Sequence, residues 1–345
     1  MANIQDVAKL AGVSISTVSR VLNGTAKVNG ELRQRVEEAM ETLAYQPNPA
    51  ARSLRTNRSR IIGLLIPDFQ NPFFMKLIQG VEDEAHLHDY SLLLYNSNED
   101  IKREQRNLQV LYNERVAGAI IVPTKEQMGT ATLKKFRERD IALVAVDRRI
   151  TDNSIDAVLV DNIRGSREAV GHLIANGYRR IGVITGPTNL TTGRERLEGY
   201  QQALQEAGIS LDAELVRSGP FTFESGQKLA EELLNLNPVI EAIFACNNVL
   251  TLGAVDAVQN RNLRIPDDMA LVGFDDVGWA ALGSISLSTV IQPAYELGKT
   301  AAQRLFHHLQ NPGIQTRQEI ILAPSLVIRG SSQPRNDLIL KRAGT

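Results

Sequence analysis

Four side chains near the N-terminus are of the types that can read the edges of DNA bases. They lie within one short stretch: Ile15, Ser16, Ser19 and Arg20. An arginine can donate two hydrogen bonds to guanine, a serine hydroxyl can donate or accept one, and an isoleucine can contact the methyl group of thymine. If these residues share the outer face of a helix, that helix is suited to the major groove.

The surrounding residues have the pattern of a helix-turn-helix. Apolar side chains recur at i, i+3, i+4 and i+7 in the first predicted helix: Ile4, Val7, Ala8 and Ala11. Gly12 can supply the backbone angle of the turn, and Ser14 can cap the second helix. The inward face of that helix is apolar: Val18, Val21 and Leu22. The alternative is an ordinary amphipathic hairpin whose outer face is only solvated.

A third helix is predicted from 30 to 45, with Asn29 as its cap. Its apolar stripe consists of Leu32, Val36, Ala39 and Leu43. The prolines of 46–49 interrupt the helical pattern. Residues 50–55 have good helix propensity, but a helix this short is marginal alone in water and should form only when something packs against it.

Composition and charge restrict the class of protein. The chain has 345 residues, 43% of them hydrophobic and 22% charged, which is typical of a globular protein of two or three domains. Its one cysteine, Cys246, excludes a disulfide framework. We find neither a long apolar segment nor a secretory signal, so we expect no membrane partner and a cytoplasmic location.

Charge is distributed unevenly along the chain. The net charge is −1, but residues 1–60 hold nine basic and five acidic side chains, giving +4, so the remaining residues carry −5. A basic N-terminal region on an acidic body is expected when only that region meets phosphate groups.

From Ile61 onward, buried strands and helices alternate. Strands are predicted at 61–66, 91–95, 118–122, 142–146, 181–185, 242–245 and 270–273. Helices are predicted at 74–88, 165–176, 193–207, 225–234 and 250–260. This alternation predicts parallel sheets, and about a dozen strands favours two α/β subdomains rather than one sheet. We expect the chain to pass between the subdomains near Asn162 and to return near Gln292.

The motifs in the first 54 residues resemble the LacI/GalR family of bacterial transcription regulators. The resemblance starts with the helix-turn-helix, continues through Tyr45, Pro47 and Asn48 and the segment from Ala51 to Leu54, and extends to about residue 330. It implies a DNA-binding domain (1–46), a hinge helix and linker (47–60), a core (61–330) and a tail (331–345). The core would consist of two Rossmann-like subdomains, as in periplasmic sugar-binding proteins: 61–161 with 291–323, and 162–290 with 324–330.

The resemblance also implies how DNA is bound. Ile15, Ser16 and Arg20 would read bases, and Leu54 would wedge into the minor groove, unless it packs on its own core instead. The expected DNA-binding residues are Ser14, Ile15, Ser16, Thr17, Arg20, Asn23, Ala51, Leu54 and Arg55. A homodimer on a pseudo-palindromic operator is expected because two-fold symmetry in the protein requires it in the DNA.

A ligand site is implied between the two subdomains. The expected residues are Asn71, Phe73, Phe74, Asp147, Arg148, Arg196, Phe221, Asn247, Asp275, Trp279 and Gln292. Aromatic walls and polar groups suit the two aspects of a sugar, and most of the polar residues follow predicted strands, where ligands of open α/β sheets lie. The pattern matches a pentose best, and purine-binding members carry an arginine where this chain has Leu190. Taken singly, Asp275 could be a helix cap, the phenylalanines core residues, and Arg148 and Arg196 members of surface ion pairs.

The sequence contains no phosphate-binding loop, nucleophile elbow or zinc-protease motif, and its five histidines form no metal set. We therefore expect no catalytic residues and no cofactor. The preferred interpretation is a transcription regulator, a repressor of a carbohydrate-related operon, switched by a small sugar. The alternatives are a sugar-binding receptor without DNA function, a regulator that responds to a purine or another small molecule, and a sugar-converting enzyme.

Overall fold

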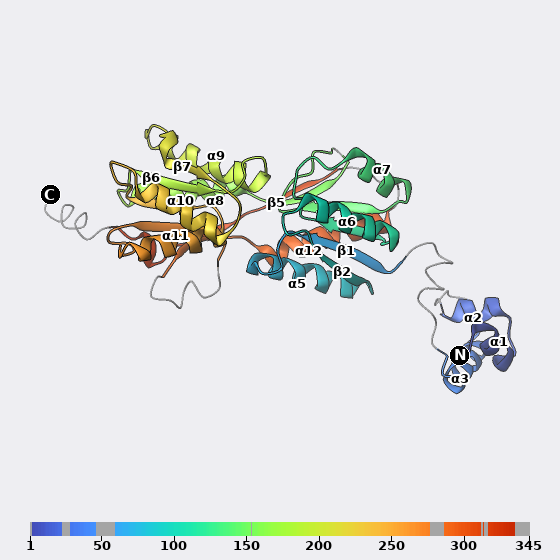
Figure 1. Ribbon diagram of the computed structural model, residues 1–345. Coiled ribbons are helices and arrows are strands. Elements are labelled where there is room, and N and C mark those ends of the chain that lie inside the picture. Colours follow the sequence, from blue (N-terminus) through green and yellow to red (C-terminus); the bar gives the residue numbers. More distant parts are fainter. Residues whose placement is uncertain are drawn as a thin grey trace. The chain divides into compact units, whose positions relative to one another are not determined.

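The computed structural model describes residues 2–22, 28–45, 59–152, 154–276, 286–311, 313 and 317–334. Residues 1–60 and 61–345 form two separate compact units, here named the head and the core. Figure 1 shows the elements of both. No helix of the described residues has both the length and the apolar character that crossing a membrane requires.

The described part of the head contains three helices: α1 (Ile4–Ala11), α2 (Ile15–Leu22) and α3 (Gly30–Thr42). A capping box begins α1, because Asn3 accepts from the backbone N–H of Asp6 at 3.1 Å while Asp6 accepts from that of Asn3 at 2.9 Å. Gly12 ends the helix in the left-handed region, at φ +61°. Ser14 then begins α2 by accepting from the backbone N–H of Thr17 at 3.1 Å.

The three helices share a small apolar core. Its fully buried members are Val7, Ala8, Ala11, Val18, Val36 and Ala39. Both predicted apolar stripes of the first two helices contribute to it, so the helix-turn-helix is confirmed. The third helix ends at Thr42, earlier than predicted.

The core contains two six-stranded sheets. The sheet of the first lobe has the order β11 (Glu319–Leu322), β5 (Asp156–Val160), β4 (Ala142–Val146), β3 (Gly118–Ile121), β1 (Ile61–Ile66) and β2 (Ser91–Asn96). The sheet of the second lobe has the order β12 (Ser325–Val327), β10 (Ser288–Ile291), β9 (Ala270–Phe274), β8 (Ala242–Ala245), β6 (Ile181–Thr185) and β7 (Val216–Ser218). All pairs are parallel except β10 with β12.

Helices cover both faces of each sheet. In the first lobe these are α5 (Pro72–Leu87), α6 (Ile101–Asn113), α7 (Thr130–Glu138) and α12 (Ala294–Gln310). In the second they are α8 (Asn162–Ala175), α9 (Thr191–Glu206), α10 (Phe223–Leu234) and α11 (Asn248–Asn260). Short 3-10 turns lie at Ala213–Leu215 and Gly330–Ser332. This is the predicted α/β architecture of two Rossmann-like subdomains.

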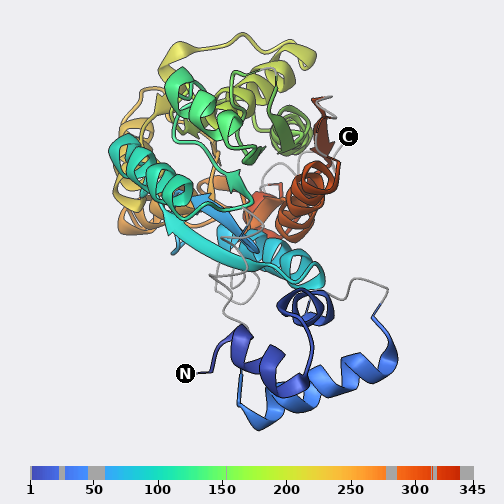
Figure 2. The same ribbon diagram turned by 90° about the vertical axis from the view of Figure 1, so that its right-hand side faces the viewer.

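Successive side chains of β1 show why its apolar run is continuous. Ile62 and Leu64 pack against α5 and α12, whereas Leu65 packs on the opposite face with α6 and α7. A strand of a parallel sheet that is covered on both sides needs apolar residues at every position. Figure 2 shows the two lobes from the end, with α5 and α12 close together.

The chain crosses between the lobes at three places. It passes from β5 to α8, returns from β10 to α12, and crosses once more between β11 and β12, which are separated by two residues. The first of these crossings lies at residue 161 and the second at residues 292–293. In the described part of the chain, neither sheet includes a strand of the other lobe. The lobes are therefore connected by these three segments and by contacts across the space between them.

The packing of α5 on α12 depends on a close backbone approach at Gly298. A Cβ atom at this position would lie 2.0 Å from the carbonyl oxygen of Leu77. We expect Gly298→Ala to lower the free energy of unfolding by about 3 kcal/mol, because the two helices must move apart. Chemical denaturation followed by circular dichroism measures the change.

Gly171→Ala in α8 is the matched control, because a Cβ atom there meets no heavy atom within 4 Å. This variant should gain about 0.5–1 kcal/mol, the usual advantage of alanine over glycine in a helix. Equal effects of the two substitutions would contradict the close approach.

Candidate functional site

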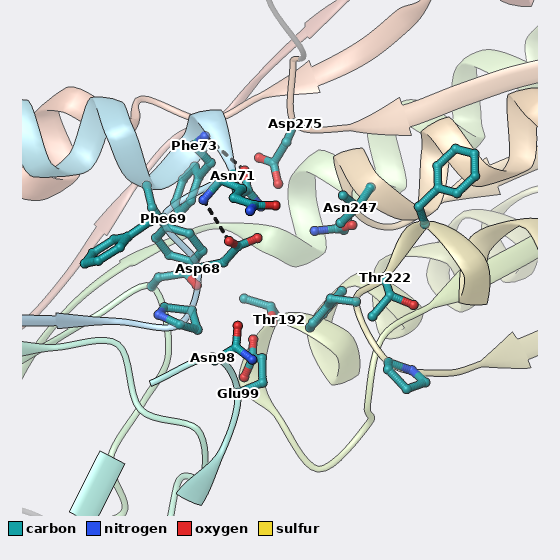
Figure 3. A pocket seen from close by; sticks show the side chains of 18 of the residues that line it. Asp68, Phe69, Asn71, Phe73, Asn98, Glu99, Thr192, Thr222, Asn247 and Asp275 are labelled. Carbon is teal, nitrogen blue, oxygen red and sulfur yellow. Dashed lines mark hydrogen bonds between the residues drawn. The ribbon is translucent and has the colours of Figure 1, made fainter. Parts of the chain in front are cut away.

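A cavity of about 580 Å³ lies at the carboxyl ends of the strands of both lobes. That volume is in the range of small-molecule sites. Ten of the eleven predicted ligand residues are described, and all ten line it: Asn71, Phe73, Phe74, Asp147, Arg148, Arg196, Phe221, Asn247, Asp275 and Gln292. Figure 3 shows several of them pointing inward from both lobes. Trp279 lies outside the described residues.

Aromatic rings form the apolar part of the cavity wall. Phe73 and Phe74 begin α5, and their ring centroids lie 5.0 Å apart in an edge-to-face arrangement. Both are more than nine-tenths buried and also belong to the core of the first lobe, so their positions are fixed by packing. Phe221 contributes from the second lobe. Two further rings were missed by the sequence reasoning: Phe69, between β1 and α5 of the first lobe, and Phe223, at the start of α10 of the second.

The two lobes place an aspartate at equivalent positions. Asp147 follows β4 and Asp275 follows β9, each the fourth strand of its sheet when counted from the β2 or β7 edge through β1 or β6. Both residues have positive φ, +66° and +72°, and each donates its backbone N–H to the neighbouring strand, at Val158 and Val290. The two residues are 4% and 6% exposed, so two buried carboxyl groups line one cavity from opposite lobes.

Arg196 of α9 lies beside Asp275. Its Nε donates to Asn162 at 2.9 Å and its Nη1 donates to the carbonyl of Cys246 at 2.7 Å. The guanidinium also lies over the ring of Phe274 and 3.8 Å from the Asp275 carboxylate. Four neighbours hold this cation in the second lobe, and its positive charge opposes the rise in the pKa of both aspartates.

Arg148 is held just as firmly in the first lobe. Both terminal nitrogens donate to Glu99, at 2.6 and 2.9 Å, and one also donates to the carbonyl of Pro123. Glu99 lies after β2 and was not predicted as a site residue. Both terminal nitrogens of Arg148, a predicted ligand residue, are thus already bound to a carboxylate of the protein.

Hydrogen bonds connect the two lobes beside the cavity. Asn71 of the first lobe and Asn248 of the second exchange two side-chain bonds, of 2.7 and 3.2 Å. Asn71 also caps α5 through the backbone N–H of Phe73. A second connection joins the backbone N–H of Arg149 to the hydroxyl of Thr191 at 3.0 Å.

Three buried polar atoms at the cavity have no hydrogen-bond partner among the described residues. They are Arg148 Nε, Thr192 Oγ1 and Gln292 Oε1. Buried polar groups of native proteins are almost always satisfied, so each such atom needs an explanation. A donor, an acceptor and a hydroxyl that can act as either, set among aromatic walls, suit a ligand with several hydroxyl groups.

The ionisable groups of the cavity are strongly affected by burial. Desolvation raises the pKa of Asp147 to about 6, against the opposing charges of Arg148 and Arg196, and Asp275 contributes repulsion. Desolvation also raises the pKa of Asp275, which Arg196 and a bond from Gln292 oppose. Burial raises the pKa of the Cys246 thiol to about 12, which leaves it unreactive.

Sequence reasoning missed several other lining residues: Asp68, Asn96, Asn98, Glu99, Thr192, Thr222 and Glu224. Asn96 ends β2, and Asp68 follows β1, so the rule that ligands lie beyond strand ends could have found them. Thr192 begins α9 and carries no sequence signal of its own. No group of three or more metal-ligating side chains was found among the described residues.

In the head, the predicted base-reading residues begin α2. Ser14, Ile15, Ser16 and Arg20 are exposed and Thr17 is half-buried. The hydroxyl of Ser14 lies 2.7 Å from that of Ser16 and 2.9 Å from that of Thr17, so these three form one polar group at the start of the helix. The other predicted DNA-binding residues, Asn23, Ala51, Leu54 and Arg55, lie outside the described residues.

The raised pKa of Asp147 predicts a pH dependence of stability. A pKa of about 6 in the folded protein, against an ordinary value of 3.8, corresponds to about 3 kcal/mol between the two protonation states. The folded protein holds a proton on Asp147 more tightly than the unfolded chain does. The stabilisation that results is fully present below about pH 4 and is lost as the pH rises through 6. We expect Asp147→Asn to gain stability relative to wild type between pH 4.5 and 7.5.

Urea denaturation of both proteins across this range measures the difference. Asparagine tolerates the positive φ of this position and resembles the neutral carboxyl group, so the variant isolates the charge. A difference in unfolding free energy that is independent of pH would contradict the raised pKa.

Two family descriptions match the chain. "Bacterial regulatory proteins, lacI family" matches residues 3–48, and "Periplasmic binding proteins and sugar binding domain of LacI family" matches residues 59–326. The second match alone covers more than half of the chain. The two regions correspond to the head and to the two-lobed core.

Individual proteins agree with this. The ribose operon repressor of Haemophilus influenzae is 36% identical over 333 residues, covering 96% of this chain and 98% of that protein. The Lac repressor dimer bound to operator and the anti-inducer ONPF has a TM-score of 0.81 at 26% identity, covering 96% and 99% of the two chains. The complex of the transcriptional regulator CelR with cellobiose has a TM-score of 0.72 at 29% identity, covering 96% and 100%.

These relatives are transcriptional regulators rather than enzymes. The helix-turn-helix, the two-lobed α/β core and the matches over nearly the full length together assign the chain to the LacI family of bacterial regulatory proteins.

Proposed function

We propose that the protein represses a carbohydrate-related operon by binding operator DNA through its head, and that a small sugar bound between the lobes of the core controls this binding. The observation that carries the sugar site is the convergence of ten predicted residues on one cavity, where three buried polar atoms have no hydrogen-bond partner among the described residues. The names of the relatives, which mention ribose and cellobiose, support a sugar effector.

The chemistry of the cavity fits a sugar ring. The aromatic rings of Phe73 and Phe221 can face its C–H surface, and the carboxylates of Asp147 and Asp275 can accept hydrogen bonds from its hydroxyls. These groups come from both lobes. A bound sugar therefore stabilises the arrangement in which the lobes are close together.

Lobe movement is the proposed switch. The three connecting segments allow the lobes to rotate about them, as in hinged binding proteins. Rotation changes the geometry at Ile61, where the core begins, and so the state of residues 47–60 that lead to the head. The coupling is reciprocal, so operator DNA must change sugar affinity by the same factor, typically about 5- to 150-fold.

On the DNA side, α2 is the recognition helix of the proposal, with Ile15, Ser16 and Arg20 reading bases and Leu54 acting at the operator centre. A homodimer fits a pseudo-palindromic operator. Exposed apolar side chains on α5 and the edge strand β2 support such a dimer: Met75 at 53%, Leu87 at 75% and Leu94 at 37%. The proposal gives the chain no catalytic activity and places it in the cytoplasm, with the DNA.

Base reading by Arg20 can be tested by selecting bound duplexes from a random library and measuring affinity for the selected sequence. Arg20→Ala should lose about 1–3 kcal/mol at one or two base pairs of that sequence, and much less on random DNA. Arg33→Ala is the control, because Arg33 lies on α3 and forms an exposed ion pair with Glu37. An equal loss on selected and random DNA would show that Arg20 contacts only phosphates.

The effector site can be tested with a thermal-shift screen of D-ribose, D-xylose, L-arabinose, D-glucose, D-galactose and cellobiose. The sugar that raises the melting temperature should also change affinity for the selected duplex. Asp275→Asn should weaken that sugar at least tenfold, about 1.4 kcal/mol, and leave DNA binding without sugar intact.

The control for this variant is Asp267→Asn, which removes a carboxylate of the same lobe that pairs with Arg264 outside the cavity. A sugar response of Asp275→Asn at the wild-type concentration would move the site elsewhere. The receptor alternative would be favoured if the protein bound a sugar but selected no duplex from the library and showed no salt-dependent binding to DNA.

A further inference from the structure

The cavity of the core is acidic. Its lining contains five carboxyl groups, those of Asp68, Glu99, Asp147, Glu224 and Asp275. Against these stand two guanidinium groups, of Arg148 and Arg196, and the described residues of the lining include neither lysine nor histidine. The formal charge is therefore −3, and protonation of one buried aspartate still leaves −2.

Both arginines are already engaged by groups of the protein, and the Nε of Arg148 has no hydrogen-bond partner among the described residues. Both terminal nitrogens of Arg148 are bound by the carboxylate of Glu99, and its side chain is only 4% exposed. Arg196 donates to Asn162 and to the carbonyl of Cys246, and Asp275 lies 3.8 Å away. A phosphate would have to displace the carboxylate of Glu99 to reach the terminal nitrogens of Arg148, and beside Arg196 it would meet the carboxylate of Asp275.

The backbone around Glu99 holds its carboxylate in this place. Asn98 and Glu99 both have φ of +53°, which residues other than glycine rarely adopt. The turn is fixed on both sides. The backbone N–H of Ser97 donates to Ile66 at 2.8 Å, and Asp100 caps α6 through the N–H groups of Lys102 and Arg103.

Helix N-termini provide the main opposing electrostatic effect. The starts of α5, α9, α10 and α11 all lie at the cavity and carry partial positive charge, about half an elementary charge each at most. The first residue before each of three of these helices already caps it with a side-chain oxygen: Asn71 caps α5, Thr222 caps α10 and Asn247 caps α11. The start of α9 lacks a side-chain cap, but one half charge does not cancel two or three carboxylates.

We propose that this cavity selects an uncharged sugar over its phosphorylated or acidic forms, and that Glu99 is the specificity-determining residue because it occupies the fork of Arg148. The inference rests on the proposed sugar site and adds that the ligand of this site carries no charge. Repulsion from one net negative charge within roughly 8 Å weakens binding at least about tenfold at an effective dielectric constant of about 20. The regulator then responds to the free sugar and not to its phosphate ester.

The test compares matched pairs of ligands by titration calorimetry at pH 7.5, using the full-length protein. The pairs are D-ribose with D-ribose 5-phosphate, D-glucose with D-glucose 6-phosphate, and D-galactose with D-galactose 1-phosphate. Wild type should bind the neutral member of at least one pair at least tenfold more tightly than the phosphate. Glu99→Gln should reduce this ratio at least tenfold, because Arg148 then has a free fork to offer.

Two further variants sharpen the comparison. Glu114→Gln removes a carboxylate beyond the end of α6, outside the cavity, and should leave the ratio unchanged. Asp68→Asn removes a different lining carboxylate and should also reduce the ratio, which provides a second test if Glu99→Gln fails to fold.

The outcomes separate the two proposals. If wild type binds a phosphate ester as tightly as its neutral partner, charge selection is wrong while the sugar site stands. If wild type discriminates but Glu99→Gln keeps the full ratio, the role of Glu99 is wrong. If no sugar or phosphate from these pairs or the thermal-shift screen binds at all, the sugar site itself is wrong and this inference with it.

Discussion

The core depends on two buried carboxyl groups that belong to different lobes and line the same cavity. Asp147 and Asp275 each lose solvation there, and the charge of Asp275 disfavours ionisation of Asp147. Arg196 opposes that repulsion but is itself committed to neighbours in the second lobe. The proximity of the lobes therefore has an electrostatic cost, which a ligand that donates hydrogen bonds to both carboxylates would offset. Such a cost is what allows a neutral small molecule to alter the equilibrium between lobe arrangements.

The rest of the core keeps that equilibrium adjustable. The main apolar clusters each lie within one lobe: β1 packs with α5 and α12 in the first, and β6 with α8 and α9 in the second. Across the lobes the connections are polar, such as the Asn71–Asn248 pair. Each such hydrogen bond contributes only about 1 kcal/mol net, because water replaces it when the lobes separate. Separation thus exposes little apolar core and requires no rearrangement of either sheet.

The sequence predicted what is periodic and local. Runs such as 61–66 and 142–146 are apolar at every position and were recognised as strands, whereas β7 and β12 have three residues each and contain too little pattern. The aspartates after β4 and β9 were predicted because strand ends are recognisable. Glu99 was missed because the segment 96–100 has the composition of any polar turn. Its function depends on Arg148, 49 residues away, and on two left-handed backbone conformations, neither of which local pattern reveals.

The two strand-end aspartates are equivalent in backbone, but their next residues carry opposite charges. After Asp147 comes Arg148, which pairs with Glu99 in the first lobe. After Asp275 comes Asp276, which pairs with Arg329 in the second lobe, at 3.5 Å. Each lobe thus neutralises this neighbouring charge with a partner of its own. A conformational change that left a buried charge without its partner would cost several kcal/mol of free energy, about 3–5 kcal/mol for a broken buried pair. Because these partners stay within one lobe, the lobes can separate without breaking either pair. The connections that separation does break include the Asn71–Asn248 hydrogen bonds and the ion pairs that join Arg149 to Glu195 and Arg194 to Glu126.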